Sequence, residues 1–534
     1  MTIPANTTET VWFAVAGADF DGENQADAKA EALAEHEAVL ADPEALLRRK
    51  ISDRLALQEN TKLSLPGNER LKESIDWSKQ NLADSVQVAE DLEIRETNAG
   101  KNYPAPEGEL AQMRFLGAGF PDYQWLFGTD GEYTAFASVG VGQFEPIKDH
   151  LRALKEVSLI DNGDSGKVVH EVVTDGAVYF GSNVDPGNTD ETAKFPSAVA
   201  VIWRWTGDDE FLEEMYGFSK ANMEYIFREL DEDNDGWPEG LGNVERNGMG
   251  EEKLDNTVYT IRGLYDLADM ARSMDDPATA RWATEKADGM KRRFEGSWWF
   301  GREGVTQYAD SLRNPGNEKV FQRHWIGATP MEVELTNAQD QAVPGLAIPG
   351  HGRLGENQQQ HYTDANADLQ LSPDEQPGAM PEIAPSPDYG RSINRPFNER
   401  AMVLQAWGAY GTIWPVVHQH LGVRPDMGRG ELEVVPQLPP RTPDISGENI
   451  RLGDGSVTVF AKVEGSAYTT RVEPAVALDE LVVGHTVPRD ARILSVTLNG
   501  APVNDYLVRE TNRGQEILIQ AATSGEQTLV VTTA

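Results

Sequence analysis

The sequence has no cysteine among its 534 residues. Without thiols it can form no disulfide, no cysteine-ligated zinc or iron–sulfur centre and no thiolate nucleophile. Basic residues are also scarce: 47 Lys and Arg stand against 87 Asp and Glu, which gives a formal net charge of −40 at pH 7. Binding to nucleic-acid phosphates needs clustered Lys and Arg, so this charge balance argues against a nucleic-acid partner.

Long hydrophobic runs are missing as well. No apolar run reaches the roughly 18 residues of a membrane-spanning helix. The first ten residues, MTIPANTTET, have neither the basic nor the apolar region of a signal peptide. We therefore expect a cytoplasmic protein without a membrane partner. Hydrophobic residues still make up 39% of the chain, enough for a large core, which excludes wholesale disorder.

Residues 1–20 are expected to hold one strand of a β-domain that is largely absent from this chain. Residues 10–17 are apolar nearly throughout, as in strands buried on both faces, yet nothing nearby could pair with them. A second chain or segment would then supply the rest of that domain. The alternative is a simple strand that caps the next domain. Residues 21–67 carry Ala/Leu periodicity and are expected to form a helical linker.

Residues 68–436 are predicted to form an (α/α)6 toroid, a barrel of helical hairpins. Several consecutive pairs combine a strongly apolar helix with an amphipathic one, which favours an inner ring covered by an outer ring. Loops at one end of such a barrel would carry the site. The candidate helices are 68–87, 131–139, 143–157, 192–206, 208–230, 256–273, 276–294, 328–338 and 398–421.

The composition changes after Pro436. Segments between residues 437 and 534 alternate or run apolar, and Asp-Gly, Asn-Gly and Arg-Gly pairs at 454, 499 and 513 separate them. This pattern predicts a C-terminal β-sandwich over 437–534. The preceding proline cluster is short, so we expect the sandwich to pack rigidly on the helical domain.

Carboxylates and aromatic residues in Gly/Pro-rich loops are the groups available for chemistry, because the sequence has no cysteine, few histidines and no GxxxxGK[ST] motif. They gather in residues 120–133, 235–250 and 378–407. Glycoside hydrolysis uses such groups: one carboxylic acid protonates the leaving oxygen, and a second carboxylate activates water or attacks the anomeric carbon. Aromatic faces hold the sugar rings.

A separate acidic motif begins at Asp231. Asp231, Asp233, Asp235 and Gly236 occupy positions 1, 3, 5 and 6 of an EF-hand-type calcium loop. Position 12 is a glycine, and an acid at position 9 compensates only in part. The alternative is a helix C-terminal turn that uses the same Asp/Asn/Gly chemistry. Calcium here is the one cofactor that the sequence suggests, and otherwise none is expected.

The order of several segments resembles the six-hairpin glycosidase superfamily, specifically its glucoamylase and glycogen-debranching-type members. These segments are IWRWTGDDEFLEE, DNDGWPEG, LDNTVYTIRGLYDLADMA, WFGREGVTQYADSL, HWIGATPMEVEL and PE…QAWG. They span about residues 68–435 and follow the family order. The resemblance implies the (α/α)6 barrel with its C-terminal sandwich. Debranching-type enzymes also carry a β-domain before the barrel, which would explain the isolated first strand.

The resemblance also implies a general acid. In glucoamylase-like enzymes it lies in a short loop before a long helix, a place that Glu245 occupies here. This sequence departs from the family pattern in lacking an aromatic residue directly before Glu245 and in having Arg246 after it. If the two paired, Arg246 would lower the pKa of an acid that should stay protonated. Glu251 and Glu252 are the alternatives.

A general base and a sugar-binding aspartate follow from the same resemblance. The base of debranching-type enzymes lies in a Pro-Glu or Ser-Glu element upstream of a Gln-Ala-Trp segment, which matches Glu382, and Glu399 is the competing base. Asp130 matches the aspartate that holds hydroxyl groups of the non-reducing sugar. Thr129 replaces the arginine that usually precedes it.

Further substrate contacts are expected from residues near these carboxylates. Trp125, Trp237 and Trp407 could hold sugar rings or serve only in barrel packing. His324 and Trp325 are expected to line the pocket, with His324 as a hydrogen-bonding residue, because glycosidase chemistry needs no histidine base. Arg246 and Glu399 complete the expected substrate-binding set.

Together these features predict an inverting, exo-acting glycoside hydrolase on α-glucosidic or related neutral-sugar linkages, with an oligosaccharide or glycoside as substrate. Inversion needs the two carboxyl groups roughly 6.5–9.5 Å apart. A sugar phosphorylase is the alternative, with phosphate bound by Arg391, Arg395 and Arg400 near Glu382. A non-catalytic carbohydrate-binding scaffold is the third. Polysaccharide lyases usually rely on a Tyr/His pair and basic subsites, which the scarce lysines and the motif order disfavour.

Overall fold

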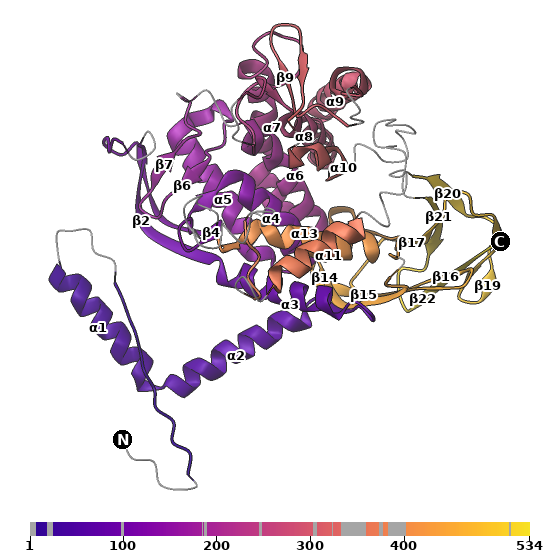
Figure 1. Ribbon diagram of the computed structural model, residues 1–534, viewed down its shortest axis with the longest axis horizontal. Helices are drawn as coiled ribbons and strands as arrows, with labels where there is room; N and C mark the ends of the chain where they lie inside the picture. The colour runs from indigo at the N-terminus through magenta and orange to yellow at the C-terminus, as the bar shows by residue number, and fades with distance from the viewer. Residues whose placement is uncertain are drawn as a thin grey trace. The chain divides into compact units, whose positions relative to one another are not determined.

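The computed structural model describes the chain in two units, residues 1–59 and Asn60–Ala534 (Figure 1). It describes all residues except 1–6, 19–24, 98–100, 184, 186–188, 245–247, 303–306, 323, 333–358, 373–376, 383–401, 440 and 512–513. In this part of the chain, no helix has both the length and the apolar character needed to cross a membrane.

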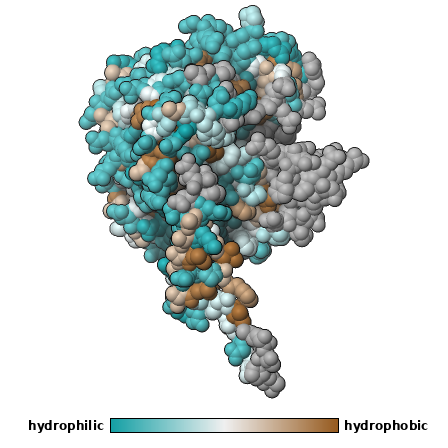
Figure 2. Space-filling model, turned by 90° about the vertical axis from the view of Figure 1, so that its left-hand side faces the viewer, coloured by the Kyte–Doolittle hydropathy of each residue, from teal (hydrophilic) through white to brown (hydrophobic). Residues whose placement is uncertain are grey.

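The first unit contains two helices, α1 (Gln25–Ala41) and α2 (Pro43–Glu59), and none of their described side chains is buried. Residues 7–18 take no regular secondary structure in this chain, so the strand expected over residues 10–17 is not formed here, and its place in a separate β-domain stays a prediction. A strand needs a neighbour for its N–H and C=O groups, and the described residues of this unit provide none. Phe13 and Val15 are 89% and 98% exposed. Figure 2 shows such apolar side chains on the surface of this unit.

Helical hairpins dominate the first part of the second unit. The inner helices α4, α6 and α8 pack side by side and are buried along nearly their whole length, whereas α5, α7 and α9 bury one face each. Asp208 and Asp276 cap the N-termini of α7 and α9, because their side chains accept hydrogen bonds from the backbone N–H groups of Phe211 and Thr279. These caps fix where each helix begins. The helices are α3 (Glu69–Asp84), α4 (Gly128–Gly140), α5 (Phe144–Asn162), α6 (Thr189–Thr206), α7 (Asp209–Glu229), α8 (Leu254–Ser273), α9 (Pro277–Trp298), α10 (Thr329–Glu332), α11 (Gln359–Gln370) and α13 (Tyr410–Trp414).

The strands between the helices were not foreseen. A five-stranded sheet has the order β3-β2-β7-β6-β5, and β11 pairs with β4. The latter pair replaces part of the helix expected over 398–421, which is wrong at Leu404 and Gln405, because their backbone is paired with residues 119–120. The strands are β2 (Val86–Glu96), β3 (Gly108–Leu116), β4 (Gly119–Phe120), β5 (Leu126–Phe127), β6 (Glu171–Val172), β7 (Ala177–Tyr179) and β11 (Leu404–Gln405).

The C-terminal region is made of two sheets, which confirms the expected β-rich end of the chain (Figure 1). One has the order β1-β14-β15-β16-β22-β18-β19, and the other β12-β13-β17-β21-β20. The Thr470 hydroxyl on β16 donates to the Gly484 carbonyl on β17, so the sheets contact each other face to face. Asn499 and Gly500 both have positive φ, as the predicted Asn-Gly hairpin turn requires.

Three strands of these sheets come from before residue 437. They are β1, β12 and β13; β1 pairs with β14, and β13 runs parallel to β17. The strands are β1 (Lys62–Ser64), β12 (Val423–Asp426), β13 (Glu431–Val434), β14 (Asp444–Leu452), β15 (Gly455–Glu464), β16 (Ala467–Ala475), β17 (Glu480–Val487), β18 (Ile493–Leu498), β19 (Ala501–Pro502), β20 (Leu507–Glu510), β21 (Gln515–Ala521) and β22 (Gln527–Thr533).

Candidate active site

Acidic residues begin each of the three inner helices. Asp130 lies in the first turn of α4, Asp190 and Glu191 in that of α6, and Asp255 in that of α8. A helix N-terminus favours negative charge, because its free N–H groups carry partial positive charge. Asp190, Glu191 and Asp255 are nevertheless buried, which is costly for carboxylates without partners. The N-termini of three helices therefore bring several acidic side chains close together, and most of them are buried.

Lys194 on α6 balances part of this charge. Its Nζ lies 3.5 Å from Asp190 Oδ2 and donates to Thr129 Oγ1 at 3.2 Å. Thr129 in turn donates to Asp190 Oδ2 at 2.6 Å, which ties α4 to α6. Burial disfavours the charged form of Lys194, but the charges of Asp190, Asp255 and Glu132 outweigh burial and raise its pKa. The ammonium group also faces aromatic rings of α4 and α8, about 5 Å away.

The structure brings Asp130 and Glu382 to the same place. Asp130 Oδ1 accepts a hydrogen bond from the Gln405 side-chain amide. The backbone N–H of Gln405 donates to Met380 O at 2.8 Å, and the N–H of Glu382 donates to Met402 O at 3.0 Å. Burial raises the pKa of Asp130 to about 6, with the charge of Glu382 as a further cause. The backbone pairing of residues 380–382 with 402–405 thus positions both predicted carboxylates.

His170 and Glu191 form a hydrogen-bonded pair near Asp130. His170 Nδ1 lies within hydrogen-bond distance of Glu191 Oε1. Burial disfavours the imidazolium, but the charge of Glu191 and this hydrogen bond raise the pKa of His170 well above its ordinary value. The positive charge of His170 opposes the burial of Asp130 and lowers the Asp130 pKa. Gly128 N–H donates to His170 O at 2.9 Å, so the start of α4 fixes the histidine.

Several buried acceptor atoms around these groups have no hydrogen-bond donor among the described residues. They are Glu132 Oε1 and Oε2, Glu191 Oε2, Asp255 Oδ1, Asn256 Oδ1 and Gln405 Oε1. Buried polar atoms are nearly always paired, and an unpaired one costs about 1–3 kcal/mol. A ligand rich in hydroxyl donors would satisfy such a set.

The loop that contains Glu245 starts at this cluster. Asn243 N–H donates to Asp255 Oδ2 at 2.9 Å, and Leu241 O accepts from the Asn256 amide at 3.0 Å. Glu245 and Arg246 themselves lie outside the described residues, and so does Glu399. The alternatives for the acid lie elsewhere: Glu251 accepts a hydrogen bond from the Asn314 backbone, and Glu252 is part of an acidic cluster near β9 (Ser311–Arg313).

Of the tryptophans expected to contact substrate, two lie near the carboxylates and one does not. Trp125 stacks on Phe127, whose ring contacts His170, and Trp407 packs against Tyr133 of α4. These two tryptophans therefore lie near the carboxylates. Trp237 does not: it is buried against Trp298 and under the Arg293 guanidinium, 4.5 Å from its ring.

His324 stands beside the residues that lead into α8. Its N–H donates to Asp310 Oδ1 at 3.1 Å, and Asp310 O accepts from the backbone N–H of Leu254, the first residue of α8. Its Nε2 lies 2.9 Å from Gln322 Oε1. The side chain of Trp325 lies outside the described residues.

Sequence reasoning missed Asp190, Glu191, Lys194, His170 and Asp255. The signal was available: TDETAK opens the apolar helix α6, and LDN opens α8. Starting the predicted helices at 192 and 256 left these acids in the preceding loops. Charged residues in the first turn of a helix that is otherwise apolar are unexpected in a plain core helix and mark a site.

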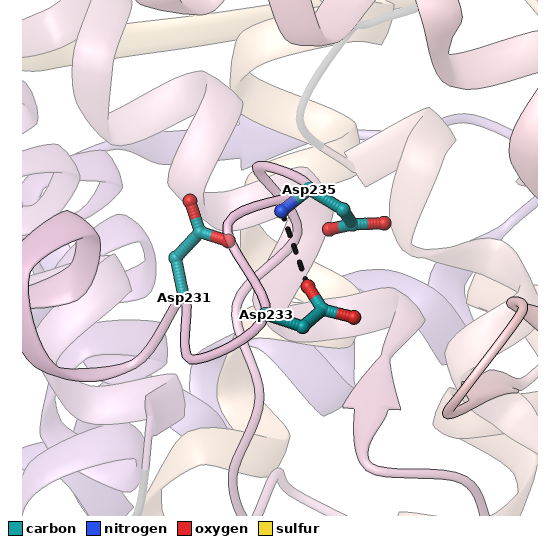
Figure 3. Close-up of side chains that lie close together, drawn as sticks. All are labelled: Asp231, Asp233 and Asp235. Atoms are coloured by element: carbon teal, nitrogen blue, oxygen red, sulfur yellow. Dashed lines mark hydrogen bonds between the residues drawn. The ribbon is translucent and has the colours of Figure 1, made fainter.

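An acidic cluster that could hold a metal ion lies just after α7. Asp231, Asp233 and Asp235 each offer a carboxylate oxygen, and these atoms lie within 4.8 Å of one another (Figure 3). This is where the sequence suggested calcium.

The fold is similar to that of solved glycosidases. The α-L-rhamnosidase of Dictyoglumus thermophilum aligns with 89% of this chain and 50% of its own, at a TM-score of 0.53 and 14% identity. A GH78-family rhamnosidase of Bacillus sp. GL1 aligns with 80% of this chain and 43% of its own, at a TM-score of 0.50 and 13% identity. A bacterial glucoamylase complexed with acarbose aligns with 55% of this chain at a TM-score of 0.38 and 12% identity.

No protein-family model and no curated protein matches the sequence. This chain spans about half the length of the two rhamnosidase structures. At such low identity the likeness shows the fold alone. The chain resembles these rhamnosidase structures in fold, with a helical part followed by a C-terminal sheet region.

Proposed function

We propose that this chain is an inverting, exo-acting glycoside hydrolase that cleaves α-glucosidic or related neutral-sugar linkages. Its hairpins would close into an (α/α)6 barrel with the site at the N-terminal ends of the inner helices. In this proposal Glu245 protonates the glycosidic oxygen, Glu382 deprotonates the attacking water, and Asp130 binds hydroxyl groups of the terminal sugar. No resident cofactor takes part in the reaction.

The main support for the proposal is that Asp130, Gln405 and Glu382 lie close together. These residues lie far apart in the sequence, yet Gln405 donates to Asp130, and the Glu382 carboxylate accepts from Met402 N–H at 2.8 Å. A base must be held in one orientation to activate water efficiently, and this backbone contact restrains Glu382. Asp130 would then face the sugar with its acceptor oxygens.

The unpaired buried acceptors support a neutral, hydroxyl-rich ligand. Each hydroxyl of a sugar can donate one hydrogen bond. Glu191, Asp255 and Gln405 each present a buried oxygen that lacks a donor in the described chain. A uronate would bring a further negative charge to this acidic cluster, which Coulomb repulsion disfavours. Trp125 and Trp407 would supply apolar faces for the ring.

The test is a panel of aryl glycosides and disaccharides with anomer-resolved detection by NMR. α-Glucosides are tested first. α-L-Rhamnosides are tested second, because the two aligned structures are named rhamnosidases. We expect hydrolysis with inverted anomeric configuration. Glu245→Gln and Glu382→Gln should each lower kcat by at least about 100-fold, the usual size of general acid–base catalysis. The control is Glu232→Gln, an exposed acid.

Three outcomes would contradict the proposal. Retention of configuration would exclude the inverting mechanism. Turnover that requires inorganic phosphate and releases a sugar 1-phosphate would make the protein a phosphorylase. Sugar binding without turnover, unchanged in Glu382→Gln, would indicate a carbohydrate-binding scaffold.

A further inference from the structure

Five carboxylates meet between the end of α7 and β8 (Glu252–Lys253). Asp231, Asp233 and Asp235 form one group, and Asp233, Glu239 and Glu252 form a second, each with its oxygens within 4.8 Å of one another. Asp233 belongs to both groups. The acidic motif recognised in the sequence is therefore only the outer half of a larger cluster, and its inner half comes from two buried glutamates.

The chain path explains how the two halves meet. Asn234 and Gly236 have positive φ, which curls residues 231–236 so that the three aspartates approach one another (Figure 3). Glu239 then forms an antiparallel bridge with Glu252. Gly240 N–H donates to Glu251 O at 3.1 Å, which continues the same pairing.

Glu252 is the observation that points to a ligand. Its side chain is 0% exposed, and neither carboxylate oxygen accepts a hydrogen bond of ordinary geometry from a described residue, although the nearby Asn314 amide helps to lower its pKa. Asn314, whose amide donates to Glu239 Oε1 at 3.2 Å, also has its Oδ1 buried without a partner. In the described chain no Lys, Arg or His forms an ion pair with any of the five carboxylates. Burial raises the pKa of Glu252 to about 8, and the charges of Asp235, Asp233 and Glu239 add to the rise.

We propose that a divalent cation of the Ca²⁺ class binds at Asp233, Glu239 and Glu252, with Asp231 and Asp235 completing its acidic shell. Ca²⁺ takes six to eight oxygen ligands at about 2.3–2.6 Å, so two ligands of one ion lie at most about 5 Å apart. The oxygens of each group lie within 4.8 Å of one another, which is compatible with a shared Ca²⁺. Mg²⁺ usually keeps several waters and binds through only one or two carboxylates, so the number of carboxylates here favours Ca²⁺.

This ligand set differs from that of an EF-hand loop. There the bidentate glutamate stands at position 12 of the same loop, where this chain has Gly242. Here Glu252 reaches the cluster from the next strand, just before α8. The bound cation would therefore join the end of α7 to the start of α8.

The position of the cation has a consequence for the proposed acid. Glu239 and Glu252 pair at the two ends of the loop that contains Glu245. A cation held between them would fix both ends of that loop. This consequence, unlike cation binding itself, rests on the proposed function.

The test is titration of the full chain, stripped with EDTA, by calorimetry with CaCl2 and by terbium luminescence. Tb³⁺ replaces Ca²⁺ in oxygen sites, and the buried Trp237, two residues after Asp235, would sensitise its emission. We expect saturable binding of Ca²⁺ that is at least ten times tighter than that of Mg²⁺. Glu252→Gln and Asp233→Asn should each weaken Ca²⁺ binding at least tenfold, whereas Glu232→Gln, an exposed acid in the same loop, should not.

Thermal unfolding gives a second readout of cation binding that does not depend on enzymatic activity. Ca²⁺ should raise the Tm of the wild type and of Glu232→Gln but not that of Glu252→Gln. Glu252→Gln is isosteric with the protonated carboxyl and should fold; if it does not, Asp233→Asn at an exposed position gives the same comparison. No heat and no terbium emission up to millimolar metal would overturn the proposal, as would unchanged binding in both variants. Equal affinity for Mg²⁺ would exclude the Ca²⁺ assignment. None of these readouts depends on glycoside hydrolysis.

Discussion

At the scale of single residues, burial decides the chemistry of this site. The pKa values of Asp130 and His170 are shifted far from their ordinary values, because one is a half-buried acid near Glu382 and the other a half-buried base next to Glu191. Desolvation alone would neutralise both groups. Their mutual attraction keeps both charged forms accessible near neutral pH. Perturbed pKa values in such a group are the physical sign of a functional site.

Asp130 should set the acid limb of the pH–rate profile. In the proposed function its ionised form accepts sugar hydroxyls, so kcat/KM should rise with pH through about 6, the raised pKa of Asp130. The Gln405 hydrogen bond favours the ionised form and lowers that pKa. Gln405→Leu should therefore move the limb to higher pH. Gln112→Leu, an exposed glutamine on β3, is the control, and an unchanged limb in Gln405→Leu would contradict this assignment.

His150 should act on stability instead. Its Nδ1 accepts from Leu116 N–H at 3.2 Å, its Nε2 lies 3.0 Å from Phe127 O, and burial lowers its pKa to about 4. The folded state therefore holds the neutral ring. This contribution is complete above pH 6.5 and is lost as the pH falls towards 4, by roughly 3 kcal/mol at about 1.4 kcal/mol per pKa unit.

The measurement for His150 is urea denaturation from pH 7 to pH 4. The difference in unfolding free energy between the wild type and His150→Gln should shrink over that range. His36→Gln on α1 serves as the control. An NMR titration that finds the His150 ring protonated at pH 6 would contradict the prediction.

At the scale of secondary structure elements, the close approach of α4 and α6 positions the site. A Cβ at Gly128 would lie 2.2 Å from Glu191 Cγ and 3.1 Å from Val169 O. No side chain fits there without moving α6 or β5. The glycine thus allows the first turn of α4 to contact Glu191, the partner of His170.

Gly128→Ala should destabilise the protein by about 1–3 kcal/mol, as overpacking a tight contact does. It should also shift the pH dependence set by Asp130, because Glu191 and His170 must move. Gly217→Ala is the matched control on α7: a Cβ there meets nothing within 4 Å. That change should stabilise the helix by about 0.5–1 kcal/mol. Chemical denaturation measures both, and equal effects at the two positions would refute the close-packing argument.

At the scale of the whole molecule, residues 1–59 and Asn60–Ala534 are separate units. The second contains the buried helices, both C-terminal sheets and every described residue of the candidate site. The first has no buried side chain in α1 or α2 and displays apolar side chains such as Phe13 and Val15. The stability of the second unit should therefore not depend on the first.

Deletion of residues 1–59 should leave the free energy of unfolding within about 0.5 kcal/mol of the full chain, the usual size of surface effects. β1 begins at Lys62 and stays in its sheet beside β14. Urea denaturation followed by circular dichroism would measure the difference, and the proposed hydrolysis should persist. A loss of several kcal/mol, or failure to fold, would show that the second unit depends on residues before Asn60.

Local pattern was enough to predict most of the helices and the C-terminal sheets. Apolar spacing placed α5, α7 and α9 within a few residues, because a helix on the surface of a core must repeat its buried face every 3.6 residues. The Asn499-Gly500 turn followed from the positive φ that such a hairpin demands. The short strands β4 to β7 and β11 carry too few residues for a period to show, so they were missed. The strand expected over residues 10–17 was predicted from an apolar run, and these residues take no regular secondary structure in the described chain.

The sequence by itself determined the helical hairpins, the sheet-rich C-terminus and the family-like order of motifs, because each depends on neighbours along the chain. Only the tertiary structure decided that Asp130 meets Gln405 and Glu382, that Asp190, Glu191 and Lys194 share their site, and that Glu252 completes the acidic loop. The physical reason is that burial and charge are properties of a place in space. A carboxylate acquires its pKa, its partner or its metal from groups that the fold, and not the chain order, brings beside it.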